Sequence, residues 1–199
     1  MRSPRWGCSF AQSVWRDSPG AEELADLHGA EAPSEWVARW AQLVTRGPVL
    51  DVASGAGRHA RFFAGRGLAV VAVDNVPQSI PGATFVQADL ESGQRWPFAG
   101  QRFAAVVVTN YLHRPLFAQL ELALDEGGVL IYETFMAGNE RYGRPSNPVY
   151  LLQPGELLRA FKALTVVAFE QGTVERPKRA AMQRICAVRG PAESARIAP

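Results

Sequence analysis

The chain has 199 residues, of which 47% are hydrophobic, enough for one packed domain. Its formal charge is only +2, from 21 basic and 19 acidic residues, so charge gives no reason to expect a nucleic-acid partner. No window approaches the roughly 18 apolar residues of a membrane span, and the N-terminus lacks the apolar stretch of a signal peptide. Cys8 and Cys186 stand far apart without metal-type spacing. We expect a cytoplasmic protein with no metal and no membrane partner.

Composition divides the chain into three regions. We expect an irregular N-terminal segment at 1–33, a folded domain at 34–190 and a loose tail at 191–199 that is rich in Ala and Pro. Ser34 precedes a stretch up to Val44 in which Trp36 and Trp40 stand four residues apart. This spacing predicts a capped amphipathic helix whose tryptophans pack on a sheet.

Seven short apolar runs predict strands at 48–53, 69–74, 84–88, 103–109, 128–133, 164–170 and 183–188. Helical patterns separate most of them, at 58–64, 116–124 and 155–162. The run 104–108 is apolar at every position, which is typical of a parallel strand buried on both faces. The last two runs have no adequate helix between them, so 171–182 is expected to be the connecting arm of an antiparallel hairpin.

The turn after the first strand has the composition of a nucleotide-cofactor site. The apolar run 49–52 leads into a loop with Gly55 and Gly57, and helix-forming residues follow from Arg58. Glycines at a strand-to-helix turn allow a tight bend and a close approach of a ligand to the backbone. The helix start beyond them presents unpaired N–H groups to an anionic group.

Two cofactors are compatible with this turn. Gly55-x-Gly57-x-x-Ala60 fits the loose dinucleotide pattern, and Asp74 follows at 74 − 55 = 19 residues, where a ribose-binding acid belongs. Asp51, however, would be a like-charge neighbour of a pyrophosphate. S-adenosylmethionine has no phosphate and carries an ammonium and a sulfonium, so an acid at this point favours it over NAD.

A third acid supports the same choice. The run 85–90 predicts a strand that ends in Asp89, so Asp51, Asp74 and Asp89 would lie along one edge of the sheet. Carboxylates accept hydrogen bonds from an adenine amino group, a ribose diol and an ammonium. Each acid on its own could instead cap a helix or end a strand.

The segment between the second and third strands is short. Only 85 − 74 − 1 = 10 residues separate Asp74 from Phe85, and Pro77 and Pro81 are among them. A parallel crossover usually needs a dozen or more residues and a helix. We therefore expect this helix to be reduced to a turn or lost, with Asn75 still placed to touch the cofactor.

The chain resembles a class I S-adenosylmethionine-dependent methyltransferase from about Ser34 to about Val188. The matching segments are 49–57, 70–74, 85–90 and 127–132. The family's first-loop pattern is acid-x-Gly-x-Gly-x-Gly, and Ala53 replaces its first glycine. We expect alanine to be accommodated there with ordinary strand-end dihedrals. Within the superfamily, the chain is most similar to small single-domain enzymes grouped with tellurite-resistance and thiol methyltransferases.

The resemblance implies an α/β fold with a doubly wound, mostly parallel seven-stranded sheet and a C-terminal antiparallel hairpin. It implies that Asp74 binds the ribose, Asp89 lies near the adenine, and Asp51 with the glycine loop holds the methionine tail, whose carboxylate meets Arg58. The expected cofactor-binding set is Asp51, Ala53, Gly55, Gly57, Arg58, Asp74, Asn75, Asp89, Leu90 and Asn110.

The acceptor site is expected beyond the fourth and fifth strands, because open α/β sheets bind ligands at the carboxyl ends of their strands. Tyr111 and His113 are candidate catalytic residues there. Glu133 is a candidate substrate contact as well, although a structural role fits it equally. Some amino-methylating relatives keep an Asn/Asp-Pro-Pro-aromatic motif at this point. The pattern here is Asn110-Tyr111-Leu-His, which does not support methylation of adenine or of protein amides.

A long connection, 136–153, follows the fifth strand without helical or strand periodicity. Loops of this length in α/β domains tend to be functional or disordered. It contains Arg141, Tyr142 and Arg144, groups suited to holding an anionic or planar acceptor, although surface arginines are often only solvated.

These observations favour methyl transfer from S-adenosylmethionine to a small-molecule acceptor. Two alternatives stay open from the sequence: a non-catalytic domain that binds the cofactor as a sensor or partner subunit, and an NAD(P)-dependent oxidoreductase. The acceptor atom and the oligomeric state are not determined by the sequence.

Overall fold

The computed structural model describes residues 32–191 and residue 193. The expected N-terminal segment, 1–33, lies almost wholly outside the described residues, and so does most of the expected tail, 191–199. Within the described residues, no helix is long and apolar enough to cross a membrane.

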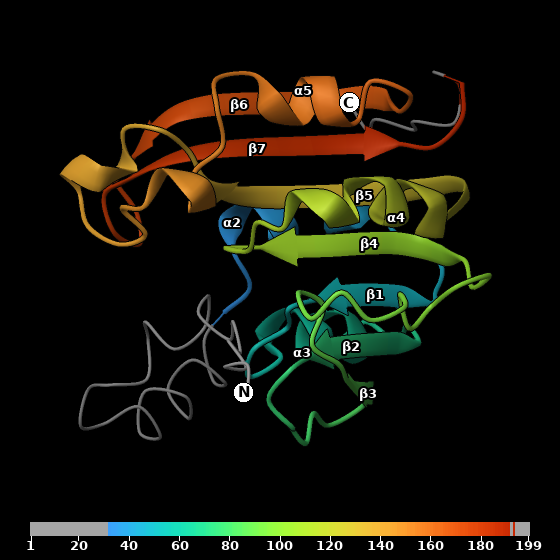
Figure 1. Cartoon of the computed structure of the whole chain (residues 1–199). Coiled ribbons are helices and arrows are strands. Elements are labelled where there is room, and N and C mark those ends of the chain that lie inside the picture. The colour runs from blue at the N-terminus through green and yellow to red at the C-terminus, as the bar shows by residue number, and fades with distance from the viewer. Residues whose placement is uncertain (1–31, 192, 194–199) are drawn as a thin grey trace, which may run out of the picture.

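The described chain is organised around one seven-stranded sheet (Figure 1). Its strands in chain order are β1 (Val49–Val52), β2 (Val70–Asp74), β3 (Thr84–Gln87), β4 (Phe103–Thr109), β5 (Leu124–Phe135), β6 (Thr165–Val174) and β7 (Ala180–Val188). Their order in the sheet is β3-β2-β1-β4-β5-β7-β6. The strands β1 to β5 pair in parallel, whereas β7 pairs antiparallel with both β5 and β6. The expected doubly wound, mostly parallel sheet with a C-terminal antiparallel hairpin is confirmed.

Helices cover both faces of this sheet. One face carries α2 (Glu35–Trp40), extended by the 3-10 turn η2 (Ala41–Leu43), and α3 (Arg58–Gly65). The other face carries α4 (Phe117–Ala123), preceded by η3 (Arg114–Leu116), and α5 (Glu156–Ala160). In Figure 1, α4 and α5 lie in front of the sheet and α2 lies behind it. The central strands are therefore buried on both sides.

Alternate residues of β4 show how this two-sided core is built. Val106 and Val108 belong to the hydrophobic cluster under α4 and α5, whereas Ala105 and Val107 belong to the cluster under α2 and α3. All four are buried. Successive side chains of a strand point to opposite faces, so a run that is apolar at every position fills both layers. The structure thus confirms the sequence interpretation of 104–108.

The helix α2 begins as its sequence predicts. The Ser34 hydroxyl caps it by accepting a hydrogen bond from the Val37 N–H at 3.0 Å. Trp36 and Trp40 are buried in the cluster on that face of the sheet. The α-helical part ends at Trp40 and continues only as the short turn η2, so it is shorter than the expected helix up to Val44.

The crossover between β2 and β3 contains no helix, as expected from its length. Ile80, in the middle of this segment, is buried in the same cluster as Ala60 and Phe63 of α3. Ile80, with the partly buried Ala83, therefore contributes to the core where the crossover has no helix.

The C-terminal hairpin differs from the expected one in where its strands end. The two strands run through 165–174 and 180–188, so only 175–179 connect them, and most of the expected arm at 171–182 is strand. Their register pairs Thr165 with Val188 and Val174 with Ala180. The polar composition of 171–179 concealed these strands, because the far end of β6 is exposed and carries no alternating apolar pattern. The expected helix 155–162 is likewise shorter, at Glu156–Ala160.

The long connection 136–153 is called the β5–α5 loop below. It is not featureless, because it contains two 3-10 turns, η4 (Asn139–Arg141) and η5 (Pro148–Tyr150). An isolated bridge between Met136 and Leu152 brings its two ends together. The loop lies at the carboxyl end of β5, the same edge at which β1 and β4 end (Figure 1).

Candidate functional site

The loop after β1 takes three left-handed residues in alternation. Ala53, Gly55 and Gly57 have φ values of 53°, 54° and 81°. The expectation that Ala53 keeps ordinary strand-end dihedrals is therefore wrong. A residue with a Cβ meets steric resistance in the left-handed region, at a cost of about 1–2 kcal/mol. Ala53 thus takes a left-handed conformation that glycine adopts without this cost.

The two glycines of this loop have different requirements. A Cβ on Gly57 would lie 2.5 Å from the Ile80 Cδ1 atom, so glycine is needed there for packing as well as for its positive φ. A Cβ on Gly55 would meet nothing within 4 Å, and Gly55 is exposed. Gly57 is therefore required by the fold, whereas Gly55 leaves open space on the outer side of the turn.

Asp51 lies inside β1 and is 1% exposed. Its Oδ2 atom accepts a hydrogen bond from the Ala60 N–H, in the first turn of α3, at 2.9 Å. Its Oδ1 atom is buried and has no hydrogen-bond partner. Burial raises the pKa of Asp51 to about 7, although the Ala60 N–H and the charge of Arg58 oppose the rise. One oxygen therefore caps the helix, and the other is left to accept from a donor that the described residues do not supply.

Asp74 joins the loops that follow β1 and β2. Its Oδ2 atom accepts from the Gly55 N–H at 2.9 Å, and its Oδ1 atom accepts from the Val76 N–H at 3.0 Å. The carboxyl is 6% exposed, and its charge contributes to raising the pKa of Asp51. The two acids expected to share a cleft are thus neighbours at the carboxyl edge of β1 and β2.

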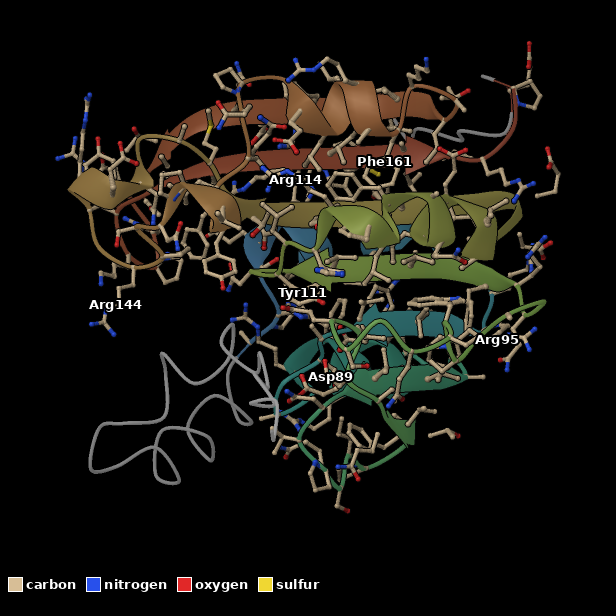
Figure 2. All side chains as sticks on the ribbon, viewed as in Figure 1. Asp89, Arg95, Tyr111, Arg114, Arg144 and Phe161 are labelled. Carbon is tan, nitrogen blue, oxygen red and sulfur yellow. The ribbon has the colours of Figure 1, made fainter. Side chains whose placement is uncertain are left out.

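Asp89 follows β3 and is exposed, unlike the other two acids. Its Oδ1 atom accepts from the Glu91 N–H at 2.9 Å, which closes a local turn. The charges of Glu91 and Asp89 also act on the phenol of Tyr111, whose pKa is raised mainly by burial. Figure 2 shows Asp89 and Tyr111 on the same side of the structure, at the carboxyl ends of the strands. Asp89 therefore lies close to the end of β4, and the preceding Ala88 donates its N–H to the Asp74 carbonyl at the end of β2 at 3.0 Å.

Buried polar atoms without partners gather at this edge. Among the described residues, seven buried side-chain nitrogen or oxygen atoms have no hydrogen-bond partner, and four of them belong to loops or strand ends of β1, β2 and β4. These four are Asp51 Oδ1, Ser54 Oγ, Asn75 Oδ1 and Tyr111 Oη. Buried polar atoms are normally paired, so a cluster of unpaired ones indicates a place where a ligand or water completes the bonding. The other three are Trp40 Nε1, Arg61 Nη2 and Arg184 Nε, of which Arg184 Nε lies 3.0 Å from the Glu133 carboxylate.

His59 was not singled out from the sequence, yet it connects three elements at the site. It is 1% exposed in α3, its Nε2 atom accepts from the Ser34 N–H at 3.2 Å, and its Nδ1 atom lies 3.3 Å from the Thr109 Oγ1 atom. Burial, with the charge of Arg58, lowers the pKa of His59 to about 3. The ring is therefore neutral, and its proton is assigned to Nδ1 because Nε2 accepts. A histidine one residue after Arg58 gave no sequence signal, since its partners are 25 and 50 residues away.

The end of β4 supplies the candidate acceptor side. Asn110 is exposed, has a φ of 54° and donates its N–H to the Glu133 carbonyl at 3.0 Å. The Tyr111 carbonyl accepts from the Tyr132 hydroxyl at 2.9 Å. His113 is half-buried, and its carbonyl accepts from the Leu116 N–H at 3.0 Å as η3 begins. These residues form one fixed wall at the edge where β1, β2 and β4 end.

Glu133 is engaged in an ion pair. It is 3% exposed on β5, and its carboxylate lies 3.0 Å from the Arg184 Nε atom of β7. The Arg184 guanidinium also lies 5.9 Å from the Trp36 ring centroid. The structure therefore shows Glu133 joining two strands, in line with the structural role that was open for it.

The three candidate substrate residues of the β5–α5 loop differ in their surroundings. Arg141 and Arg144 are exposed, and Figure 2 shows Arg144 at the outer end of the loop, away from the sheet. Tyr142 is half-buried and turned toward the hairpin: its hydroxyl lies 3.5 Å from Thr173 Oγ1, and the Arg179 guanidinium lies 5.0 Å from its ring centroid. The structure thus separates two arginines that face solvent from a tyrosine that anchors the loop.

Comparison with known families identifies the domain. Residues 50–131, from the middle of β1 to the middle of β5, match a model described as a methyltransferase domain. The chain contains a class I S-adenosylmethionine-dependent methyltransferase domain. The matched segment of this domain includes all three acids, the glycine loop and Tyr111.

Solved structures share the fold of the methyltransferase domain. TehB from Haemophilus influenzae superposes with a TM-score of 0.67 at 13% identity, over 85% of this chain and 66% of the TehB chain, so this chain spans about two thirds of TehB. A TehB-like S-adenosylmethionine-dependent methyltransferase from Corynebacterium glutamicum gives 0.60 at 20% identity, over 85% and 96% of the two chains. The glycopeptide N-methyltransferase MtfA, solved with S-adenosylhomocysteine, gives 0.57 at 19% identity, over 87% and 98%. No curated protein sequence gives a match.

The methyltransferase domain shows no metal-binding constellation in its described part. Within 32–191, no group of three or more His, Cys, Asp or Glu side chains is arranged to hold a metal ion. Cys186 is a buried free thiol in β7, and burial raises its pKa to about 12.

Proposed function

We propose that the protein transfers a methyl group from S-adenosylmethionine to a small-molecule acceptor bound at the carboxyl edge of β1, β2 and β4. The single observation that carries this proposal is the cluster of four buried, unpaired polar atoms at that edge. They are three oxygens of the β1 and β2 regions and one phenol at the end of β4. This set offers acceptors for an ammonium and a ribose together with a donor beside them.

The residues fit the parts of the cofactor in the order of the strands. Asp51, through its unpaired Oδ1 atom, accepts from the ammonium of the methionine tail, and Ser54 and the exposed Gly55 border the same space. Asp74 binds the ribose hydroxyls, and Asn75 follows it. These assignments rest on the acidic side chains at this edge, which favour the positively charged S-adenosylmethionine over the pyrophosphate of NAD.

The remaining members of the set complete the two ends of the cofactor. Asp89 and Leu90 border the adenine, next to Tyr111. Arg58, at the start of α3, meets the carboxylate of the methionine tail. Ala53 and Gly57 give the loop its left-handed shape, and Asn110 bounds the site at the end of β4.

When bound, S-adenosylmethionine supplies a methyl group that is already activated by a sulfonium. The protein's own contribution is then mainly to orient the acceptor and to exclude water, and such positioning can supply on the order of 7–11 kcal/mol. Tyr111 acts as a hydrogen-bond donor, because burial raises its pKa and keeps the phenol protonated. His113 stands at the same wall and is the candidate base for acceptors that must lose a proton.

The acceptor is proposed to carry negative charge. Arg141 and Arg144 are both exposed on η4 and the turn that follows it, at the carboxyl end of the sheet. Guanidinium groups bind oxyanions and carboxylates through two parallel hydrogen bonds. Replacing both arginines with Ala is expected to raise the acceptor KM at least about tenfold, the loss of one charged hydrogen bond. The affinity for S-adenosylhomocysteine is expected to stay within about twofold of the native value.

The experiment that tests the proposed function has two stages. Calorimetric titration of the whole chain with S-adenosylhomocysteine and, separately, with NAD is expected to show binding of the first only. An acceptor screen that includes thiols, oxyanions such as tellurite, and amines is then read by release of S-adenosylhomocysteine. Binding without turnover of any acceptor would instead support the alternative function, a domain that binds the cofactor as a sensor or partner subunit.

A further inference from the structure

Arg114 joins the end of β4 to the second half of the β5–α5 loop. Its guanidinium makes two hydrogen bonds to the Glu156 carboxylate, Nε to Oε1 at 2.6 Å and Nη2 to Oε2 at 3.1 Å. It also donates to two backbone carbonyls of the loop, Val149 at 2.7 Å and Leu151 at 2.9 Å. Glu156 in turn accepts from the Gln153 N–H at 2.7 Å. One side chain thus fixes the loop at two carbonyls and at the start of α5.

The first half of the loop has a separate anchor. Asn139 is 1% exposed, donates its amide nitrogen to the Pro145 carbonyl at 2.9 Å, and accepts from the Ala181 N–H of β7 at 3.1 Å. Neither Pro145 nor Ala181 takes part in the Arg114 hydrogen bonds described above. The two halves of the loop are therefore held by different side chains: Asn139 joins the first half to the hairpin, and Arg114 joins the second half to β4. Three further contacts hold the loop: the bridge between its ends, the Tyr142 contact with the hairpin, and the hydrogen bond from Gln183 to the Gln153 carbonyl.

The Arg114 attachment lies next to the candidate acceptor wall. Arg114 is four residues beyond Asn110, at the first residue of η3. The wall between them is itself held from β5 by the hydrogen bond from Tyr132 to the Tyr111 carbonyl. Tyr132 is in turn packed between the rings of Phe117 and Phe161, with centroids 6.1 and 6.0 Å away. Figure 2 shows Arg114 and Phe161 in the same layer in front of the sheet. The wall is thus held by β5 and by packed aromatic rings, and Arg114 ties the loop to it.

We propose that Arg114 is a positioning residue of the acceptor site: with Glu156, it holds the second half of the β5–α5 loop, 147–153, against the carboxyl end of β4. It acts through the loop and needs no contact with the reacting atoms. The part of this inference that concerns the acceptor rests on the proposed function. The clamp itself rests only on the contacts within the chain.

An arginine is required by this geometry. Its planar fork reaches a carboxylate with two nitrogens and still presents hydrogens to two carbonyls on its other side. A lysine would keep the charge but would present one compact donor group that cannot span Glu156, Val149 and Leu151 together. Arg114→Lys therefore removes the clamp while preserving the charge at this position.

The test is amide hydrogen exchange on the full-length native chain and the Arg114→Lys variant. The N–H groups of Tyr150 and Leu151 are bonded within the clamped half, and that of Leu152 joins this half to the Phe135 carbonyl at the end of β5. Those of Asn139 and Tyr142 are bonded within the other half. Exchange at 150–152 is expected to become about tenfold faster or more, the effect of losing charged hydrogen bonds. Exchange at 139 and 142 and in the sheet is expected to be unchanged.

Arg46→Lys is the matched control. Arg46 also bonds a carboxylate and a carbonyl, those of Asp125 and Glu126 near the start of β5, but Arg46 is exposed and precedes β1, so these bonds lie at the opposite edge of the sheet. It is expected to leave exchange in the loop unchanged. Glu156→Gln serves as a second variant, because it keeps the shape of the partner and weakens only its charge. Glu156→Gln is expected to speed amide exchange at 150–152 as well, but by less than Arg114→Lys does.

Two further measurements separate the clamp from the proposed function. Binding of S-adenosylhomocysteine to Arg114→Lys, by calorimetry, is expected to stay within about twofold of native; no binding to either protein would refute the proposed function and leave the exchange result to decide the clamp. With an acceptor from the screen, Arg114→Lys is expected to raise KM about tenfold and to leave kcat within about threefold. Unchanged exchange at 150–152, equal loosening of both halves of the loop, or an unchanged KM would each overturn the proposal.

Discussion

The two halves of the sheet differ in whether their buried polar groups have hydrogen-bond partners. In the half formed by β1 to β4, four buried polar atoms at the carboxyl edge have no partner among the residues that the structure describes. In the half formed by β5 to β7, the buried side chains of Glu133, Asn139 and Gln183 have partners within the protein, mostly backbone groups. Gln183 shows this: it accepts from the Leu157 N–H at 2.7 Å and donates to the Gln153 carbonyl at 3.1 Å.

This difference distinguishes residues that build the fold from residues that serve a ligand. Paired groups such as Gln183, Asn139 and the Glu133–Arg184 pair contribute stability through bonds made within the protein. An open set such as Asp51 and Tyr111 costs stability unless something completes it. The stability that these unpaired atoms cost the ligand-free protein can therefore be recovered when a cofactor binds and supplies their partners.

The largest effect is expected from breaking the closed half. Arg184→Ala leaves the Glu133 carboxylate, 4% exposed, without its partner, and should lower the free energy of unfolding by about 3–5 kcal/mol. Affinity for S-adenosylhomocysteine should stay within about twofold, because the pair is not part of the open set. Denaturant unfolding and calorimetry measure the two quantities.

Arg39→Ala is the control for that change. Arg39 pairs with Glu170 at 3.0 Å, but both side chains are about half exposed, so the loss should be at most about 1 kcal/mol. If Arg184→Ala lowered the binding free energy of S-adenosylhomocysteine by more than it lowered the free energy of unfolding, the separation of the two halves would be contradicted.

The next largest effect is expected from Asp74→Ala. It removes the acceptor of both the Gly55 and Val76 N–H groups and the proposed ribose ligand. Two charged hydrogen bonds correspond to a loss of roughly 100-fold in affinity for S-adenosylhomocysteine, measured by calorimetry. Asp89→Ala, on the exposed acid, should lose no more than about tenfold. Equal losses of affinity in the two variants would show that the contribution of these acids to cofactor binding does not follow their burial.

The pH dependence of binding tests Asp51. Its pKa of about 7 means that the ligand-free protein binds a proton there at lower pH. A ligand ammonium favours the ionised carboxylate, so affinity for S-adenosylhomocysteine should rise about tenfold from about pH 6 to about pH 8. Asp51→Asn should abolish that rise. A native affinity that is flat over this range would be incompatible with a contact between Asp51 and the ammonium.

The same shift has a consequence for stability. Because the native state binds this proton more tightly than the unfolded chain, whose carboxyl has a pKa near 3.8, the ligand-free protein should lose stability as pH rises from about 4 through about 7. Asp51→Asn should remove this loss, which thermal unfolding at several pH values would measure.

The smallest effect is expected at Ala53. Ala53→Gly relieves the steric cost at φ 53° but makes the unfolded chain more flexible, so stability should change by less than about 1 kcal/mol. Cofactor affinity should be unchanged because the loop already has its left-handed shape. Destabilisation by more than that would mean that the Ala53 methyl group contributes packing.

The cofactor half was largely predictable from the sequence because its determinants are local. Patterns only a few residues long predict three of its features: the turn in 49–57, the acid at Asp74 and the short crossover before Phe85. Periodicity located the buried strands for the same reason. The left-handed Ala53 was not predicted, since no composition rule places alanine at a positive φ, and the shape of the loop overrides the residue's preference.

The acceptor half was predictable only in outline because its contacts join distant residues. Arg114 and Glu156 are separated by 42 residues, and Glu133 and Arg184 by 51 (184 − 133), so no local pattern reveals either pair. The strands in 171–182 were missed because exposed strand ends carry polar residues. His59 was missed as well, because its importance lies in its partners Ser34 and Thr109.

The most direct test of the central claim is a crystal structure of the chain with S-adenosylhomocysteine bound. We predict that the ligand lies at the carboxyl edge of β1, β2 and β4 and gives Asp51 Oδ1, Ser54 Oγ, Asn75 Oδ1 and Tyr111 Oη their missing hydrogen bonds, directly or through water. A ligand bound elsewhere, or one that leaves these four atoms unpaired, would contradict it.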